Sequence, residues 1–149
     1  MSVLALSTAP AAGAALQQHE EITLIAGVGI VGDRHAGHRR SVTIVCSGEL
    51  ADAAAELRVE SIDGVPTRRN IVVDAPALPR THGTVFRIGD VGFEVWRDCA
   101  PCELMNETFG DGAKDALQQR CGISATVVTD GIIRVGDPID FDAPPSPTS

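Results

Sequence analysis

The sequence has no tyrosine, one tryptophan and four phenylalanines, so its hydrophobic core must be mostly aliphatic. Lysine is almost absent as well, because Lys114 is the only lysine among the 12 basic residues. Enzymes that use pyridoxal phosphate need a lysine for the Schiff base, and we expect Lys114 to lie on a helix away from the other motifs. Pyridoxal phosphate chemistry is therefore not expected in this chain.

Long apolar runs and a basic surface are also missing. No apolar run approaches the roughly 20 residues of a membrane-spanning helix, and the formal net charge of -8 disfavours binding to nucleic acid or an anionic membrane. The four cysteines are too few for a disulfide framework. Segment 1–16 has no basic residue, so we expect a strand and a loop there instead of a signal peptide. These absences predict a cytoplasmic protein with reduced thiols.

Short alternating or β-branched segments are the main pattern that is present. Strands are expected at residues 3–6, 21–25, 41–46, 70–73, 84–88, 91–96, 124–129 and 132–135, with hairpin turns at 89–90 and 130–131. Helices are expected from Ser47, as N-cap, to Leu57, and over 114–120. The pattern predicts one mostly β domain over residues 1–142, a mostly antiparallel barrel with two or three short helices. Residues 143–149 are expected to form a disordered tail.

The segment Asp98-Cys99-Ala100-Pro101-Cys102 places two thiols directly after the predicted strand 91–96. Rigid scaffolds commonly present reactive groups where a strand ends. Pro101 suits the first turn of a helix that begins near Cys102, and the positive end of a helix dipole favours the thiolate form. A thiolate attacks sulfur or binds a soft metal. Cys102 is therefore the candidate reactive residue, with Cys99 as its neighbour or resolving partner.

Three other interpretations of this cysteine pair stay open. A thioredoxin-like redox pair needs a βαβ setting, which the strand pattern does not provide. A structural zinc site needs two more ligands, for which Cys121, His35 and His38 are available. The third interpretation is that both thiols are buried and inert, as we expect for Cys46 at the end of a β-branched strand.

Arginines are concentrated in two short segments, Gly32–Arg40 and Thr67–Asn70, which together contain Arg34, Arg39, Arg40, Arg68 and Arg69. The planar guanidinium binds phosphate and other oxyanions through paired hydrogen bonds. Such local density in an acidic protein indicates a small anionic ligand, although surface salt bridges would explain it equally well.

Five motifs in order resemble the MOSC domain, a module found at the C-terminus of molybdenum cofactor sulfurases and in small stand-alone bacterial proteins. They are Gly-Asp-Arg-His-Ala-Gly at 32–37, Arg-Arg-Asn-Ile at 68–71, Ile-Gly-Asp-Val at 88–91, Cys-x-x-Cys at 99–102 and Arg-Val-Gly-Asp at 134–137. The resemblance covers nearly the whole chain and implies a β-rich, barrel-like fold. This agrees with the strand pattern.

The resemblance also implies roles for individual residues. Cys102 falls on the cysteine that binds molybdenum of the pterin cofactor in relatives that reduce N-hydroxylated compounds. Arg68 and Asn70 fall on an Arg-x-Asn segment near the cofactor's phosphate. Further implied cofactor contacts are Arg34, Arg39 and Arg40, and His35 is implied as a pocket residue or proton donor. Asp33 is expected to orient Arg34 or to cap the turn.

Two hypotheses about function follow. In the first, the protein binds molybdenum cofactor (molybdopterin) through Cys102 and reduces N-hydroxylated or related substrates, with an electron-donor protein as partner. In the second, Cys102 carries sulfur as a persulfide received from a cysteine desulfurase, or hands over the cofactor, without turnover of its own. The N-terminal β-domain of the larger reductases and the pyridoxal-phosphate desulfurase domain of the sulfurases have no counterpart in 149 residues. A third class of function is also open, in which the barrel serves only as an interaction module.

Overall fold

The computed structural model describes residues 1–11, 13–37 and 41–142. Strands make up most of the regular structure in this part of the chain. In chain order they are β1 (Ser2–Thr8), β2 (Gln17–His19), β3 (Glu21–Ile25), β4 (Gly29–Ile30), β5 (Val42–Cys46), β6 (Ile71–Asp74), β7 (Val85–Ile88), β8 (Val91–Asp98), β9 (Ile123–Val127), β10 (Gly131–Arg134) and β11 (Ile139–Asp140).

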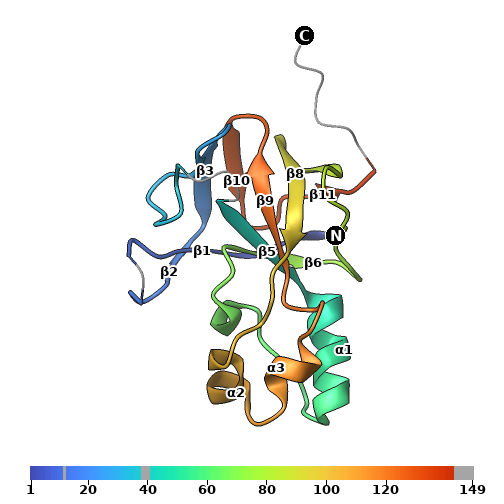
Figure 1. Ribbon diagram of the computed structural model, residues 1–149. Coiled ribbons are helices and arrows are strands. Elements are labelled where there is room, and N and C mark those ends of the chain that lie inside the picture. Colours follow the sequence, from blue (N-terminus) through green and yellow to red (C-terminus); the bar gives the residue numbers. More distant parts are fainter. Residues whose placement is uncertain (12, 38–40, 143–149) are drawn as a thin grey trace.

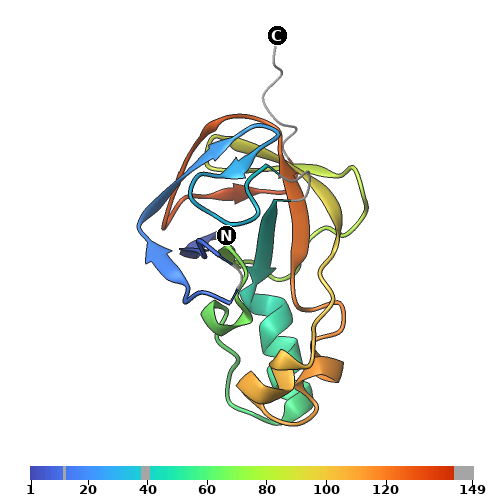
Figure 2. The ribbon, with the colours of Figure 1, turned by 60° about the vertical axis from the view of Figure 1, so that its left-hand side comes forward.

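The strands form two sheets. One has eight strands in the order β11-β7-β8-β9-β5-β6-β1-β2, and the other has three in the order β10-β3-β4. All pairings between these strands are antiparallel except β5 with β6, which are parallel and are joined through helix α1 (Ser47–Leu57). The large sheet curls into a half-barrel, and the helices gather at one end of it (Figures 1 and 2). The predicted mostly β, barrel-like domain with two or three short helices is confirmed.

The alternation of side chains along the central strands creates two cores. Ile44 and Cys46 of β5 point into the barrel, where they pack with residues of both sheets. Val45 points to the opposite face and packs against the helical layer. Aromatic residues are scarce, but Phe86 and Phe93 are fully buried and stacked, with ring centroids 5.5 Å apart. A strand buried on both faces therefore connects the barrel to the helices.

Helix α1 agrees with the predicted bounds but not with the predicted cap. Ser47 is the first helical residue, and Cys46 occupies the N-cap position without a side-chain hydrogen bond. The Ser47 hydroxyl instead donates to Asp74 Oδ1 at 2.8 Å, which ties the helix to the end of β6. Leu50 and Ala54 lie on the buried face of the helix.

The predicted hairpin across Asp130-Gly131 is wrong. β9 pairs with β5 and β8 in the large sheet, whereas β10 pairs with β3 in the small sheet. The chain crosses between sheets at this turn, and Asp130 Oδ1 accepts a hydrogen bond from the Ala26 N–H at 2.7 Å. Asp130 therefore binds the backbone that directly follows β3 instead of closing a hairpin. The other predicted hairpin, β7 with β8, is confirmed.

Two short helices follow the cysteine segment, α2 (Leu104–Phe109) and α3 (Ala113–Ala116). A short 3₁₀ helix, η1 (Val65–Thr67), precedes β6. The helix predicted over 114–120 is thus shorter, and turns carry the chain from α3 to β9. Within the described residues no helix has the length and apolarity needed to cross a membrane. The expected disordered tail over 143–149 lies outside the described residues.

The side chain of Arg80 links helix α1 to strand β8. Its guanidinium pairs with Glu49 of α1 through both terminal nitrogens, and its Nε donates to Asp98 Oδ1, at the end of β8, at 2.8 Å. The Glu49 side chain is only 10% exposed. Arg80 therefore neutralises a nearly buried carboxylate and fixes the residue that precedes Cys99.

Replacing Arg80 by methionine should lower the free energy of unfolding by about 2–3 kcal/mol, because Glu49 is then left nearly buried without its charge partner. Urea denaturation would measure the change. Arg134→Met is the matched control, since the Arg134 side chain is exposed and its pair with Glu21 spans 4.0 Å. An equal, small loss in both variants would contradict the structural role of Arg80.

Candidate functional site

The two cysteines of the Cys-x-x-Cys segment are presented differently. Cys99 directly follows β8 and is half-buried, and its N–H donates to the Gly122 carbonyl at 2.9 Å. Gly122 has φ +94°, and a Cβ there would lie 2.2 Å from the Ile44 carbonyl oxygen, so only glycine fits. Cys102 is exposed in the turn before α2, where its carbonyl accepts from the Met105 N–H at 2.9 Å. The predicted helix thus begins at Leu104, two residues after Cys102.

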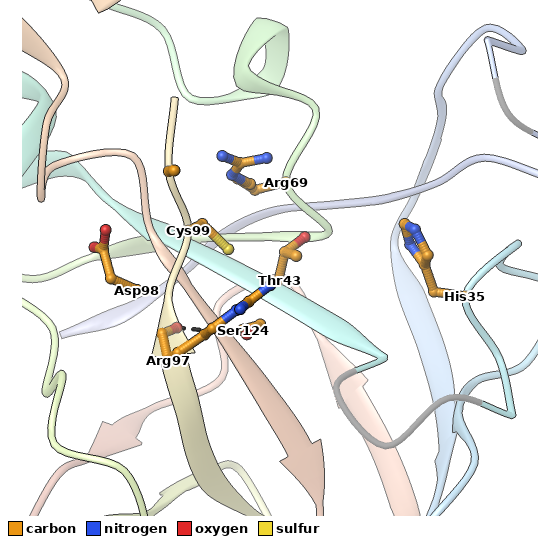
Figure 3. A pocket seen from close by; sticks show the side chains of 8 residues that line it. His35, Thr43, Arg69, Arg97, Asp98, Cys99 and Ser124 are labelled. Atoms are coloured by element: carbon orange, nitrogen blue, oxygen red, sulfur yellow. Dashed lines mark hydrogen bonds between the residues drawn. The ribbon is translucent and has the colours of Figure 1, made fainter. Parts of the chain in front are cut away.

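Cys99 lines an open pocket of about 700 Å³ at the end of β8, called here the Cys99 pocket. Its lining comes from five separate segments and consists of His35, Thr43, Arg69, Arg97, Asp98, Cys99, Ala100 and Ser124. Figure 3 shows Arg69, Thr43 and Cys99 close together and His35 on the opposite side. Ser124 donates to the Arg97 carbonyl at 3.4 Å, which joins β9 to the end of β8. The pocket therefore combines a thiol, an imidazole and two guanidinium groups.

Cys102 lines an adjoining pocket of about 200 Å³, called here the Cys102 pocket. Five of the predicted site residues line it together, namely Arg34, His35, Arg68, Asn70 and Cys102. The two pockets share three lining residues: His35, Thr43 and Arg69. Segments that lie far apart in the sequence thus converge on one site, with the two thiols in neighbouring compartments.

Arg69 was not among the individual residues predicted to contact the cofactor. It lies at the junction of the two pockets. Its Nε donates to the Cys121 carbonyl at 2.7 Å and its Nη2 lies 3.3 Å from Cys121 Sγ. These contacts fix the guanidinium while leaving other N–H groups for a ligand. Arg68 is held by a bond from Nη2 to the Ala14 carbonyl at 2.7 Å and adopts a left-handed backbone with φ 63°. Both arginines are therefore oriented before any ligand arrives.

Asn70 is buried and its side chain joins three segments. Its Oδ1 accepts from the Thr43 N–H at 3.0 Å and from the Thr43 hydroxyl at 3.1 Å. Its Nδ2 donates to the Ser7 carbonyl at 3.1 Å and to Asp33 Oδ1 at 3.3 Å. Both Oδ1 and Nδ2 of Asn70 are engaged in these hydrogen bonds. Asn70 therefore positions the three segments that it contacts at the pocket wall.

Asp33 caps the turn that carries His35. Its Oδ1 accepts from the Ala9 N–H at 3.0 Å, and its Oδ2 accepts from the His35 N–H at 3.2 Å. The same oxygen lies 3.6 Å from His35 Nδ1, and the His35 side chain is 43% exposed. The geometry supports the turn-capping alternative for Asp33, and it places the imidazole at the mouth of both pockets.

The four thiols differ in burial. Burial raises the pKa of the Cys46 thiol to about 12, consistent with the predicted inert core cysteine. Burial also raises the pKa values of Cys99 and Cys121, and in both cases the positive charge of Arg69 partly opposes the rise. Cys102 is the exposed thiol of the four.

A limiting dose of iodoacetamide at neutral pH should therefore modify Cys102 first, because it is exposed and its sulfur is accessible. Cys99 should react later and faster at higher pH, since only the thiolate reacts and burial raises its pKa. Cys46 and Cys121 should react only after unfolding. Peptide mapping by mass spectrometry would give the order, with urea-unfolded protein as the control. Modification of Cys99 before Cys102 would contradict this assignment.

Lys114 is closer to the site than predicted. It lies on α3, and its Nζ pairs with Glu103, the neighbour of Cys102, at 2.9 Å. Glu103 raises the pKa of Lys114, first through this hydrogen bond and then through its charge. A Schiff-base lysine needs the opposite shift. The expected position away from the motifs was wrong, and the pairing with Glu103 does not favour Schiff-base chemistry.

Metal ligation by protein side chains alone is not supported in the part of the chain that the structure describes. No group of three or more His, Cys, Asp or Glu side chains there could hold a metal ion. Of the proposed zinc ligands, His38 lies outside the described residues, as do the predicted cofactor contacts Arg39 and Arg40. Thr43, Arg69, Arg97 and Ser124 are among the polar pocket residues that were not predicted from the sequence. Only Arg69 carried a signal, as the middle residue of Arg-Arg-Asn.

The family model of the MOSC domain matches residues 31–140. Since this match spans most of the chain, the protein belongs to the MOSC domain family. The family is associated with the molybdenum cofactor, and membership suggests a function related to that cofactor. No curated protein sequence matches the chain.

Solved structures share the fold. The YuaD protein from Bacillus subtilis superposes with a TM-score of 0.77 at 20% identity, over 93% of this chain and 94% of that one. YiiM from Escherichia coli superposes with a TM-score of 0.64 at 18% identity, over 94% of this chain and 69% of that one. YiiM from Geobacillus stearothermophilus gives a TM-score of 0.66 at 12% identity, over 93% and 73% of the two chains. At identities this low, the similarity to these structures shows a shared fold and nothing about function.

Proposed function

We propose that this protein binds molybdenum cofactor with Cys102 as the thiolate ligand of the metal, and that it reduces N-hydroxylated or related substrates. The observation that carries the proposal is the convergence of Arg34, His35, Arg68, Asn70 and Cys102 on the Cys102 pocket. These residues come from three separate segments of the sequence, and the family assignment supports a cofactor-related role for the site they form.

The donor set fits such a cofactor. Cys102 offers an exposed thiol, and thiolates suit molybdenum better than oxygen ligands of the protein do. Arg34 and Arg68 offer guanidinium groups for the phosphate of the pterin. Because the described residues provide no cluster of three ligating side chains, Cys102 would share the metal with the sulfur atoms of the cofactor itself.

The chain's own residues would bind, orient and supply protons. Arg68 and Arg34 hold the phosphate, and Arg69 holds a second anionic or polar group at the junction of the two pockets. Asn70 fixes the turn at Asp33 and so keeps His35 in place. Arg39 and Arg40, which follow His35 in the sequence, remain predicted contacts of the cofactor.

Reduction of an N-hydroxylated substrate breaks the N–O bond, consumes two electrons and two protons, and releases water. When bound, the cofactor supplies the two-electron redox chemistry. His35 is the residue that we assign to proton delivery, because imidazole exchanges protons near neutral pH and His35 lines both pockets. The electrons would come from a separate electron-carrier protein.

Sulfur transfer is the second candidate, and the exposure of Cys102 favours it. A carrier cysteine must reach the persulfide of a cysteine desulfurase, and a half-buried thiol such as Cys99 is poorly suited to that. In this function Cys102 would accept sulfane sulfur and Lys114 and Arg68 would supply nearby positive charge. Cofactor hand-over without turnover is a variant of the same function.

Molybdenum and pterin content separates the two functions. The full chain would be purified from a molybdenum-replete host, and both would be measured per chain, followed by assay of N-hydroxylated substrates with a chemical reductant. Near-stoichiometric metal and pterin with substrate reduction supports the enzyme. Protein without metal that gains one persulfide at Cys102 on incubation with a desulfurase and cysteine supports the carrier.

Replacing Arg68 by alanine should weaken cofactor binding by about 1.5–3 kcal/mol, the range for hydrogen bonds to a charged group. The loss would appear as a lower molybdenum-to-protein ratio at limiting cofactor. Arg134→Ala is the control, because Arg134 is exposed on β10 and lines neither pocket. If both variants load like the unmodified protein, Arg68 does not bind the cofactor.

A further inference from the structure

A third pocket of about 680 Å³, called here the α1 pocket, lies beside helix α1 on the helix-covered side of the large sheet. Its walls come from β1, β2, α1, β6 and the segment that leads into η1. The lining residues are Leu4, Ala5, Gln18, Ser47, Leu50, Ala51, Ala54, Ala55, Val59, Glu60, Ser61, Ile62, Asp63, Gly64, Val65 and Val72. None of them lines the Cys99 or Cys102 pocket, so this is a separate site.

The α1 pocket differs from the cysteine site in chemistry. Most of its lining is aliphatic, and two of these side chains are unusually exposed, Leu4 at 49% and Val59 at 43%. Exposed apolar area costs free energy in water, which an apolar ligand would recover. The volume falls within the range of small-molecule sites, about 300–1,000 Å³.

The charged lining of the pocket has one sign. Among the described residues that line the pocket, Glu60 and Asp63 alone are charged, and both are exposed. Asp63 uses Oδ1 to accept from the Val65 N–H at 3.1 Å, and a carboxylate keeps further acceptor positions beyond that bond. Within the part of the chain that the structure describes, no arginine or lysine lines the α1 pocket, whereas three arginines line the Cys102 pocket. The charged side chains that line the two sites therefore differ, carboxylates in the α1 pocket and mainly guanidinium groups in the Cys102 pocket.

We infer that the α1 pocket binds a small amphipathic cation, an organic molecule with an apolar ring or chain and an ammonium group. The apolar part covers the exposed side chains of Leu4 and Val59, and the ammonium group faces Glu60 and Asp63. An anionic ligand of the same shape would meet two carboxylates without a counter-charge. This inference is independent of the proposed cofactor function.

Three probes of one shape test the charge preference. Phenethylamine, phenethyl alcohol and hydrocinnamate would each be titrated into isotope-labelled full-length protein while backbone amide NMR signals are followed. The amine should shift signals of α1 and residues 59–65 and should bind about threefold or more tighter than the alcohol, the gain expected from partly exposed charge pairs. The acid should bind most weakly.

Two variants test the site. Glu60→Gln combined with Asp63→Asn keeps the acceptor for the Val65 N–H and should remove the advantage of the amine over the alcohol. Asp52→Asn is the control, because Asp52 is exposed on α1 and does not line the pocket. Ala51→Trp should fill the pocket and abolish binding of all three probes.

Three results would overturn the inference. The first is the absence of saturable shifts at the pocket with the amine, and the second is equal binding of amine and acid. The third is concentration-dependent dimerisation in sedimentation experiments that shifts the same amides, which would assign this face to a second copy of the chain. Loss of cofactor binding at Cys102 would leave the inference untouched, so failures of the two proposals are distinguishable.

Discussion

Replacing Cys102 by serine should reduce molybdenum loading by at least about 100-fold, beyond the 10- to 100-fold typical of changes to groups that merely support a metal ligand. Serine preserves the size of the side chain but substitutes a hydroxyl, which stays protonated at neutral pH and is a poor ligand for a soft centre. Cys102 is exposed, so the change should not affect folding. Metal and pterin analysis of the purified variant would measure the loss.

Cys99→Ser is the matched control for this prediction. Cys99 lies in the neighbouring pocket, and burial raises the pKa of its thiol, so its replacement should weaken loading only partly. Circular dichroism of both variants would establish that they are folded. Intact loading in Cys102→Ser together with lost loading in Cys99→Ser would reverse the assigned roles. Unfolding of either variant with zinc in the unmodified protein would favour the structural-metal interpretation.

Replacing Asn70 by alanine should lower the free energy of unfolding by about 2–4 kcal/mol. The change removes the amide partner of the Thr43 N–H and of the Ser7 carbonyl, and each unpaired buried polar group costs about 1–3 kcal/mol. Asp33 Oδ1 also loses one of its two donors and keeps the Ala9 N–H. The loss exceeds that expected for a surface contact because Asn70 is only 5% exposed. Thermal and urea unfolding would both report it.

The same substitution should also impair the site, because the turn at Asp33 carries Arg34 and His35. Gln118→Ala is the control, because it removes a side-chain amide from an exposed position that lines none of the three pockets. Loss of stability in Asn70→Ala with normal cofactor loading would limit Asn70 to a structural role. No loss of stability would contradict the hydrogen-bond arrangement itself.

The fold class was predictable because strand periodicity is a local signal. Runs such as Val91 to Trp96 alternate apolar and polar side chains, and β8 covers that run. The partner of each strand was not predictable in the same way. Asp130-Gly131 has the composition of a hairpin turn, but β9 and β10 belong to different sheets, and this depends on contacts distant in sequence. The very short strands β2, β4 and β11 have too few residues for a periodic signal.

The candidate site was predictable in part. The motifs containing Arg34, Arg68 and Cys102 identified residues that the fold brings to one pocket. Thr43 and Arg97 were not found, because each lies on a strand whose sequence only indicates a sheet. The position of Lys114 near Cys102 was missed because it depends on the pairing of α3 with Glu103. Side-chain convergence of this kind follows from packing, which a sequence pattern does not specify.

X-ray absorption at the molybdenum K-edge would test directly whether Cys102 is a ligand of the metal. The spectrum of protein purified with its cofactor would be compared with that of Cys102→Ser reconstituted with excess cofactor, and the sulfur neighbours of the metal would be counted in each. The variant should show one sulfur neighbour fewer, because Cys102 is proposed to supply one of the metal's sulfur ligands. An identical sulfur count in both proteins would contradict it.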